Sequence, residues 1–277
     1  MSISPAILHD VETHSCVSSS APFGRFCSTP RRNYVSLHRF KTRRSSSFLV
    51  ALLLLLLPAI SAFAQASEKM SMVEIIGSGK TPVSASNLVA LCLKYKVSTT
   101  GMYSWQNHLV AYGRSENIRT VSKNLAAIYP GAKVQFYDAP FYKFDRHYCT
   151  DKTADKQWDN IILTANLVKD PTKQQEYLNY HATQFQKWPE VAQGFCNASF
   201  QQLLVFRQGR QLMLVISIPK GASLDKLNPR TSLNNPRVDD WNALMKQYQE
   251  GLPGTKPGEV WVFLKPVVMK QPVLFKK

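Results

Sequence analysis

Two residues suited to proton transfer and to sugar binding, Tyr177 and His181, lie four positions apart in the sequence. In a helix this spacing places both side chains on one face. An imidazole exchanges protons near neutral pH, and a phenol can hydrogen-bond to a sugar hydroxyl. Trp188 follows them, and an indole ring stacks on the apolar face of a pyranose. These three residues predict a sugar site, although the same spacing is also typical of residues that pack a helix core or close a helix end.

Few other residues point to chemistry. His108 falls at an expected hairpin turn, where we expect it to be exposed, and His147 falls in an expected linker. The chain has no GxSxG or HExxH motif, no CxxC or Cys/His cluster and no evident pair of carboxylates. These observations disfavour an α/β-hydrolase, a zinc site and a two-carboxylate glycosidase. We therefore expect a site without metal or cofactor.

The hydrophobic pattern predicts the order strand, helix, strand, strand, helix, strand, and predicts it twice. In the second copy, Asp170 is expected to cap the helix that begins at Pro171 and carries Tyr177 and His181. Asp239 is expected to cap a later helix that contains Trp241. The predicted strands cover residues 72–76, 102–106, 108–112, 133–137, 161–168, 200–206, 211–218 and 260–264, and the predicted helices cover 84–96, 115–129, 171–186 and 240–250.

Each copy is typical of a ferredoxin-like unit, in which helices cover one face of a sheet. The other face must also be covered, and a second copy in the same chain can cover it. We therefore predict an α+β fold in which two tandem ferredoxin-like units, residues 70–145 and 158–270, pack as a pseudo-dimeric α/β barrel. A polar linker, residues 141–159, is expected to join the two units. The alternative is two independent domains, which would leave apolar sheet faces in water.

The first 66 residues predict a leader and signal peptide. Arg43 and Arg44 precede the apolar run FLVALLLLLL at 48–57, and Ala62-Phe63-Ala64 forms a cleavage box. Cleavage there predicts export to the periplasm or the extracellular space. Two alternatives stay open: the segment could remain as a membrane anchor, and residues 1–42 could be an over-extended start.

Composition and charge narrow the class of protein. A content of 44% hydrophobic and 19% charged residues excludes disorder, collagen and coiled coil as descriptions of the whole chain. The formal net charge is +16, and beyond the leader 27 basic residues face 16 acidic ones. These are scattered, and neither unit carries the paired aromatics of an RNA-recognition strand, so we expect no nucleic-acid partner. Cys92 is expected in the core, and a bridge between Cys149 and Cys196 is left open.

The stretch from 160 to 266 resembles the L-rhamnose mutarotase family. The similarity covers over a third of the chain, and the combination of Tyr-x3-His with a following Trp-Pro-Glu is its most specific part. It is carried by Tyr177-Leu178-Asn179-Tyr180-His181, Trp188-Pro189-Glu190-Val191, LMLVISI at 212–218, the helix around Trp241 and VWVFLKP at 260–266.

The resemblance implies roles for individual residues. His181 takes the place of the family's proton donor, Tyr177 that of a sugar-binding tyrosine, and Trp241 that of one of two site aromatics. The other aromatic is replaced by Asn242, and Gln202 stands where a further sugar-binding tyrosine is usual. The gap from His181 to Trp188 is also longer than usual, so the identity of the sugar is left open.

The resemblance implies a sugar mutarotase, an isomerase that interconverts the α and β anomers of a deoxyhexose pyranose such as L-rhamnose. His181 is expected to act as general acid/base and to protonate the ring oxygen. The partner of this enzyme would be a monosaccharide, with no membrane contact after signal cleavage. The protein would be a monomer with an internal pseudo-dimer, whose first unit replaces a second subunit, or a homodimer. The rival prediction is a non-catalytic carbohydrate-binding module on the same barrel, and a haem-handling barrel is a third.

Overall fold

The computed structural model describes residues 69–79 and 83–268, so the predicted leader lies outside the described residues. Within these segments no helix has the length and apolar character needed to cross a membrane. The strands are β1 (Met70–Ile76), β2 (Met102–Trp105), β3 (His108–Arg114), β4 (Lys133–Tyr137), β5 (Tyr142–Asp145), β6 (Trp158–Leu167), β7 (Gln202–Gln208), β8 (Gln211–Pro219), β9 (Gln249–Glu250), β10 (Val262–Phe263) and β11 (Lys265–Pro266). The α-helices are α1 (Ser86–Lys94), α2 (Ser115–Ile128), α3 (Pro171–Ala182), α4 (Gln184–Lys187), α5 (Pro189–Asn197), α6 (Leu224–Leu227) and α7 (Pro236–Lys246).

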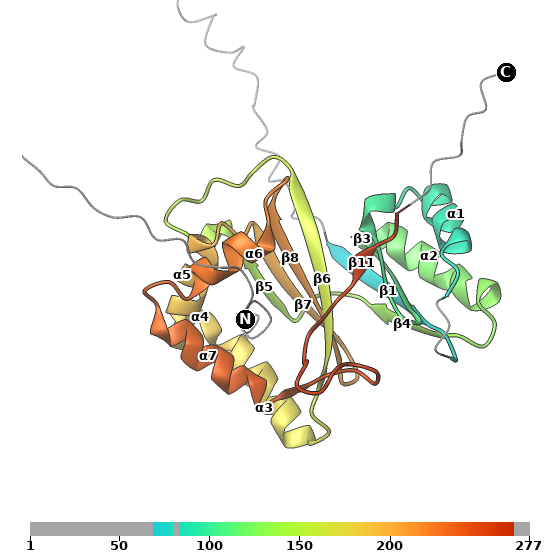
Figure 1. Cartoon of the computed structure of the whole chain (residues 1–277). Helices are drawn as coiled ribbons and strands as arrows, with labels where there is room; N and C mark the ends of the chain where they lie inside the picture. The colour runs from blue at the N-terminus through green and yellow to red at the C-terminus, as the bar shows by residue number, and fades with distance from the viewer. Residues whose placement is uncertain (1–68, 80–82, 269–277) are drawn as a thin grey trace, which may run out of the picture. The chain divides into compact units, whose positions relative to one another are not determined.

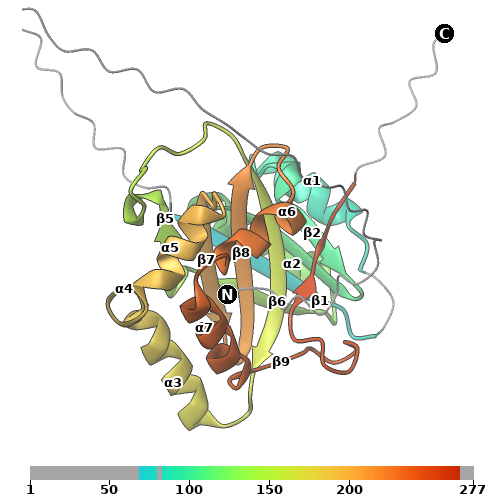
Figure 2. The ribbon, with the colours of Figure 1, turned by 60° about the vertical axis from the view of Figure 1, so that its left-hand side comes forward.

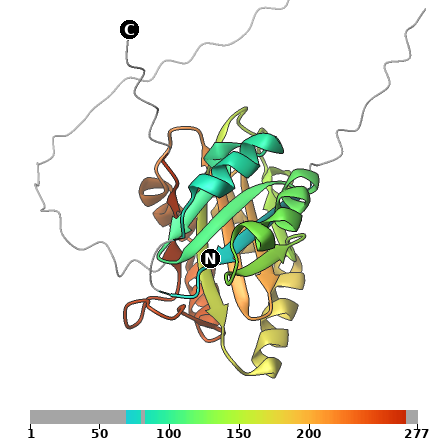
Figure 3. The same ribbon diagram turned by 90° about the vertical axis from the view of Figure 1, so that its right-hand side faces the viewer.

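The first sheet has the strand order β11-β2-β3-β1-β4, and its pairings are antiparallel. Helices α1 and α2 lie against one face of this sheet (Figure 3). Successive strand side chains point to opposite faces, so Val73 and Ile75 of β1 pack under these helices while Met72 lies on the other face. The predicted order of elements over residues 70–137 is confirmed.

The second sheet has the order β10-β6-β8-β7-β5, and β9 also pairs with β6. Helices α3, α4, α5 and α7 cover one face of it (Figure 2). The structure is therefore a mixed α/β chain with two antiparallel sheets, each compatible with a ferredoxin-like unit.

Each sheet receives one edge strand from the other half of the chain. Strand β5 directly follows the first sheet's β4 in sequence but pairs with β7 of the second sheet, with Tyr142 opposite Val205. Strand β11 follows β10 but pairs with β2 of the first sheet (Figure 1). The predicted polar linker over 141–159 thus begins with an edge strand, which the alternating apolar residues Tyr142 and Phe144 form.

A buried cluster contains residues from both sheets. Met72, Val110 and Tyr137 of the first sheet share it with Phe206 and Val215 of the second. Each sheet therefore has one apolar face under its own helices and one apolar face within this shared cluster, which accounts for the nearly continuous hydrophobic runs in β6 and β8.

A buried carboxylate, Glu74 of β1, lies on the same sheet face as this shared cluster. Its Oε1 accepts hydrogen bonds from His108 Nδ1 at 2.7 Å and from Gln211 Nε2 at 2.9 Å. Its Oε2 accepts from the Tyr137 hydroxyl at 2.8 Å and from Gln135 Nε2 at 3.0 Å. Because Gln211 belongs to β8, the carboxylate links the two sheets. The prediction that His108 is exposed is wrong: it is 9% exposed, since Glu74 holds it at the hairpin.

Two helix predictions also need correction. The helix expected to reach residue 186 ends at Ala182, and α4 and α5 follow it, so the region around Pro189 begins a new helix. Helix α7 begins at Pro236 with Asn235 before it, so Asp239 lies inside the first turn and does not cap the helix. Proline at the first helical position explains both starts, since its missing N–H needs no partner there.

Candidate functional site

Helix α3 positions the two residues on which the sugar-site prediction depends. As predicted, Asp170 caps the helix, because its Oδ1 accepts a hydrogen bond from the Thr172 backbone N–H at 2.8 Å, and Pro171 is the first helical residue. Tyr177 and His181 are the helix's two buried residues and face the second sheet. Their ring centroids lie 4.2 Å apart.

The His181 imidazole has one nitrogen satisfied and one without a partner. Nδ1 lies 2.9 Å from the backbone carbonyl oxygen of Tyr177, which can only accept, so Nδ1 carries the proton. Nε2 is buried and has no hydrogen-bond partner. Burial lowers the pKa of this imidazole to about 3, because the charged form loses its hydration. The ring is thus neutral near pH 7, and Nε2 presents a lone pair.

Aromatic rings surround this imidazole. Tyr142 and Trp241 meet it edge to face, with centroids at 5.1 and 5.3 Å, and Phe141 lies at 5.7 Å. Tyr142 in turn donates a 2.7 Å hydrogen bond to Gln184 Oε1. Rings of this kind exclude water and leave the Nε2 lone pair without competition.

The Tyr177 hydroxyl belongs to a second chain of hydrogen bonds. Gln249 Nε2 donates to it at 3.1 Å, and Gln249 Oε1 accepts from the Trp261 indole N–H at 3.1 Å. Tyr177 is fully buried, and burial raises the pKa of its phenol. The phenol therefore keeps its proton at neutral pH.

Trp241 contacts His181 directly, and Trp188 contacts Trp241. Trp241 is buried in α7, and its ring lies 5.6 Å from that of Trp188. Trp188 is half-buried between α4 and α5, and the guanidinium carbon of Arg237 lies 3.8 Å from its ring centroid. This cation–π contact occupies one face of the indole.

Gln202 does not join this group. It lies at the start of β7, and Leu204 and Phe206, which alternate with it on the same face, belong to the cluster shared by the two sheets. Its side chain hydrogen-bonds to Tyr112 of the first sheet. His181 lies with the helices on the other face, so the structure does not bring Gln202 into contact with it.

Residues that sequence reasoning missed come from distant segments. Phe141 and Tyr142 arrive with β5, and Gln249 arrives with β9, which pairs with β6. The alternation of Tyr142 and Phe144 was the available signal for β5. Nothing in the local sequence singles out Gln249, because its position depends on the pairing of β9.

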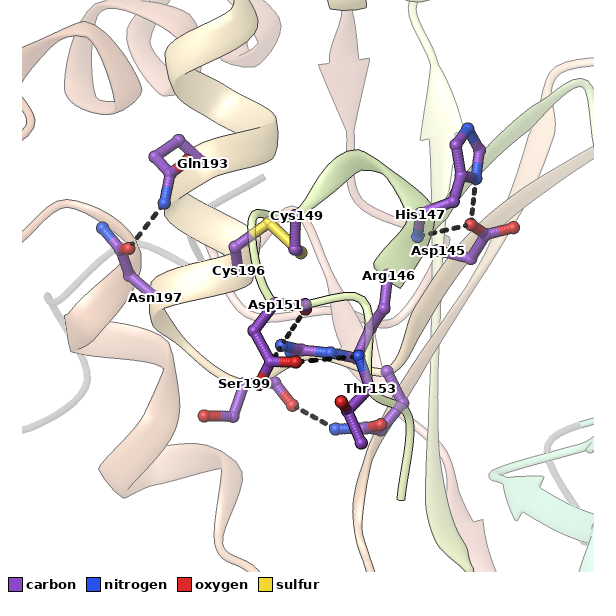
Figure 4. Close-up of a disulfide and its surroundings, with 11 residues drawn as sticks. Asp145, Arg146, His147, Cys149, Asp151, Thr153, Gln193, Cys196, Asn197 and Ser199 are labelled. Atoms are coloured by element: carbon purple, nitrogen blue, oxygen red, sulfur yellow. Dashed lines mark hydrogen bonds and ion pairs between the residues drawn. A yellow bond between two sulfur atoms is a disulfide. The ribbon is translucent and has the colours of Figure 1, made fainter. Parts of the chain in front are cut away.

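A disulfide fastens the segment that follows β5. Cys149 is bonded to Cys196 of α5, which ties the region after Tyr142 to the helix layer (Figure 4). The bridge that the sequence left open is therefore formed, and Cys92 is free and buried, as predicted. Around the bridge, Asp145 Oδ1 caps the turn at His147 and Arg146 contacts Asp151. The disulfide thus helps to hold the segment after β5 against α5.

The arrangement offers a base, a hydrogen-bond donor and apolar rings within one site. Within residues 69–79 and 83–268, no group of three or more His, Cys, Asp or Glu side chains is placed to hold a metal ion. The available chemistry is proton transfer at His181 Nε2 and hydrogen bonding at the Tyr177 hydroxyl.

The segment that contains this site is similar to known proteins. The sequence model of the L-rhamnose mutarotase family matches residues 161–268. An L-fucose mutarotase from Xanthomonas campestris pv. campestris is 35% identical over 75 residues, which are 27% of this chain and 58% of that relative. The match thus spans little more than half the length of the relative.

A solved structure, provisionally assigned as a monooxygenase from Fusobacterium nucleatum, covers 74% of this chain and 94% of its own at 11% identity. Its TM-score of 0.41 is too low to support an inference. The family match does not depend on that structure. It confirms the resemblance predicted from the residues: the segment 161–268, which contains Tyr177, His181, Trp188 and Trp241, is similar to L-rhamnose mutarotases.

Proposed function

We propose that this protein is a sugar mutarotase that interconverts the α and β anomers of a deoxyhexose pyranose such as L-rhamnose or L-fucose. The observation that carries the proposal is the buried Nε2 of His181, which has no partner in a site walled by aromatic rings. Leaving a buried polar atom unpaired costs about 1–3 kcal/mol. A sugar hydroxyl that donates to this nitrogen would recover that free energy. The family match over 161–268 supports the same activity.

In this proposal His181 acts first as a base, and not as the expected proton donor to the ring oxygen, because its imidazole is neutral and its only ring proton, on Nδ1, faces the Tyr177 carbonyl. Its neutral imidazole carries the Nδ1 proton, so Nε2 takes the proton of the anomeric hydroxyl. The bond between the anomeric carbon and the ring oxygen breaks, the electron pair stays on the ring oxygen, and that oxygen takes up a proton. Rotation about the bond between the first two carbons exposes the other carbonyl face, and the ring recloses. General acid/base help of this kind typically gives about 10²–10⁴-fold.

Three of the other predicted residues have supporting roles. Trp241 and Tyr177 hold the sugar beside His181, and Trp188 stacks on it or seals the helix end. We propose that the two sheets form a pseudo-dimeric barrel in which the first replaces a second subunit, since both contribute to one buried cluster. Export through the predicted leader remains part of the proposal, and the Cys149–Cys196 disulfide supports it because disulfides persist in oxidising compartments.

The test compares anomer exchange in the wild type and in His181→Ala by saturation-transfer NMR with L-rhamnose and L-fucose. We expect the enzyme-catalysed exchange to fall at least about 10²-fold, because the base is lost. His147→Ala, which changes an exposed imidazole, serves as the matched control and should exchange as the wild type does. Unchanged exchange in His181→Ala would refute the assignment. Sugar binding without catalysed exchange in the wild type would instead identify a carbohydrate-binding module.

A further inference from the structure

We propose that Gln249 and Trp261 are positioning residues that direct the phenolic proton of Tyr177 toward the ring oxygen of the sugar. This inference rests on the proposed mutarotase function and adds the source of the second proton. It makes Tyr177 a proton donor as well as a binding residue, and it gives a role to two residues that the sequence pattern did not select.

The hydrogen bonds of Trp261 and Gln249 determine where the phenolic proton of Tyr177 can point. The Trp261 indole N–H is a donor without acceptor capacity, so the Gln249 amide must turn its oxygen toward it, at 3.1 Å. The amide nitrogen then faces Tyr177 and donates to the phenol oxygen, also at 3.1 Å. Because that oxygen accepts this bond, its own proton is left for a different acceptor.

Backbone pairing holds the relay in place. Gln249 lies in β9, where it pairs with Leu167 of β6. Trp261 directly precedes β10, which pairs with Leu163 and Thr164 of the same strand. Both relay residues are therefore anchored to one strand, and Gln249 is only 9% exposed, so little water competes for its amide.

The two protons then balance over the reaction. His181 Nε2 takes the anomeric proton, the bond from the anomeric carbon to the ring oxygen breaks, and Tyr177 gives its proton to that oxygen. The site briefly holds an imidazolium beside a phenolate, two opposite charges on rings whose centroids lie 4.2 Å apart. On reclosure the phenolate takes its proton back from the ring hydroxyl, and the imidazolium returns its proton to the carbonyl oxygen. Both side chains end as they began.

The decisive variant is Gln249→Glu. A carboxylate can accept from Trp261 and also from Tyr177, so the phenolic proton turns away from the sugar. We expect kcat for anomer exchange to fall roughly 10²-fold, while the sugar Kd from NMR titration changes less than about threefold. Trp261→Phe removes the indole donor and frees the amide to turn, and we expect a smaller loss of roughly fivefold. If Gln249→Glu does not fold, the Trp261→Phe variant tests the proposal in its place.

Matched controls are available nearby. Gln247→Glu changes an exposed amide at the end of α7, and Trp158→Phe changes a more exposed indole that donates to Asp155. Both should exchange anomers as the wild type does.

A double-mutant cycle separates positioning from a structural effect. In a Tyr177→Phe background the proton is gone, so adding Gln249→Glu or Trp261→Phe should lower kcat less than about twofold further. A full additional loss there, or unchanged kcat in both single variants, overturns the relay while leaving the mutarotase proposal intact. A wild-type protein that catalyses no anomer exchange overturns the mutarotase proposal, and the relay with it.

Discussion

The surroundings of His181 set its proton affinity. Its Nδ1 proton is tied to a backbone carbonyl, and the ring is enclosed by Phe141, Tyr142 and Trp241. These neighbours offer no negative charge that would favour the imidazolium, and burial brings the pKa to about 3. A base of this kind is already deprotonated throughout the neutral range, so its availability does not depend on small changes of pH.

The pH profile of kcat/KM tests this assignment. We expect catalysed exchange to stay flat from about pH 8 down to pH 5, because an imidazole with a pKa of about 3 remains a base over that range. The measurement is saturation transfer at several pH values, corrected for the buffer-catalysed rate. A fall centred near pH 6.5 would show an ordinary, solvated imidazole and would contradict the buried one.

The same shift predicts how stability depends on pH. The folded pKa is lowered below the unfolded value of 6.5, so as pH falls from 6.5 towards 3 the unfolded chain takes up a proton that the folded chain does not. His181 should therefore reduce the free energy of unfolding by up to about 1.4 kcal/mol per pH unit in that window. Urea unfolding at pH 7 and pH 5 should show a smaller pH dependence in His181→Gln than in the wild type. Equal slopes in the two proteins would contradict the prediction.

At the level of elements, strand β5 and the disulfide that follows it form one wall of the site. β5 pairs with β7, and Cys149 bonds to Cys196 across 47 positions of sequence. The strand places Tyr142 beside His181, and the disulfide limits how far the segment after it can move. The wall therefore depends on contacts between segments far apart in the chain.

Removing this bridge should loosen both the fold and the site. For the double variant Cys149→Ser with Cys196→Ser we expect a loss of about 2–4 kcal/mol in the free energy of unfolding. Catalysed exchange should fall as well, because Tyr142 is held less firmly. Urea unfolding and saturation transfer measure the two effects. A reductant should lower the stability of the wild type and leave the double variant unchanged, whereas no response in the wild type would contradict a stabilising bridge.

Sequence reasoning succeeded where the signal was local. The Asp170 cap, the spacing of Tyr177 and His181 and the hairpin alternation in β8 are properties of short segments, and each reappears in the structure. Phe141, Tyr142 and Gln249 could not be placed because strand pairing over more than 40 positions brings them to the site. Likewise Glu74, a charged residue in an apolar strand, gave no sign that His108 would hydrogen-bond to it and be buried beside it.

At the scale of the whole molecule, Glu74 is one of several polar links between the two sheets. Four side chains donate to its two oxygens, and Gln211 among them comes from the opposite sheet. A buried carboxylate with a complete set of donors is tolerated, whereas removing it takes away the acceptor on which the buried His108 and Tyr137 depend.

Replacing Glu74 by Ala should therefore lower the free energy of unfolding by about 3–5 kcal/mol, measured by urea unfolding. Glu116→Ala changes an exposed glutamate in the first turn of α2 and should cost well under about 1 kcal/mol. A Glu74→Ala protein as stable as this control would show that the carboxylate contributes little to joining the sheets.

The crossing of β5 and β11 between the sheets has a consequence for gene engineering. A fragment cut to the family-matching segment would lack β5, so β7 would present a bare row of backbone donors and acceptors to other chains. The first half expressed without the tail would likewise lose the strand beside β2. Neither half should therefore be expressed or transplanted alone. In a library of shuffled or truncated genes, the soluble variants should be those in which β5 and β11 are each kept together with the sheet that they complete.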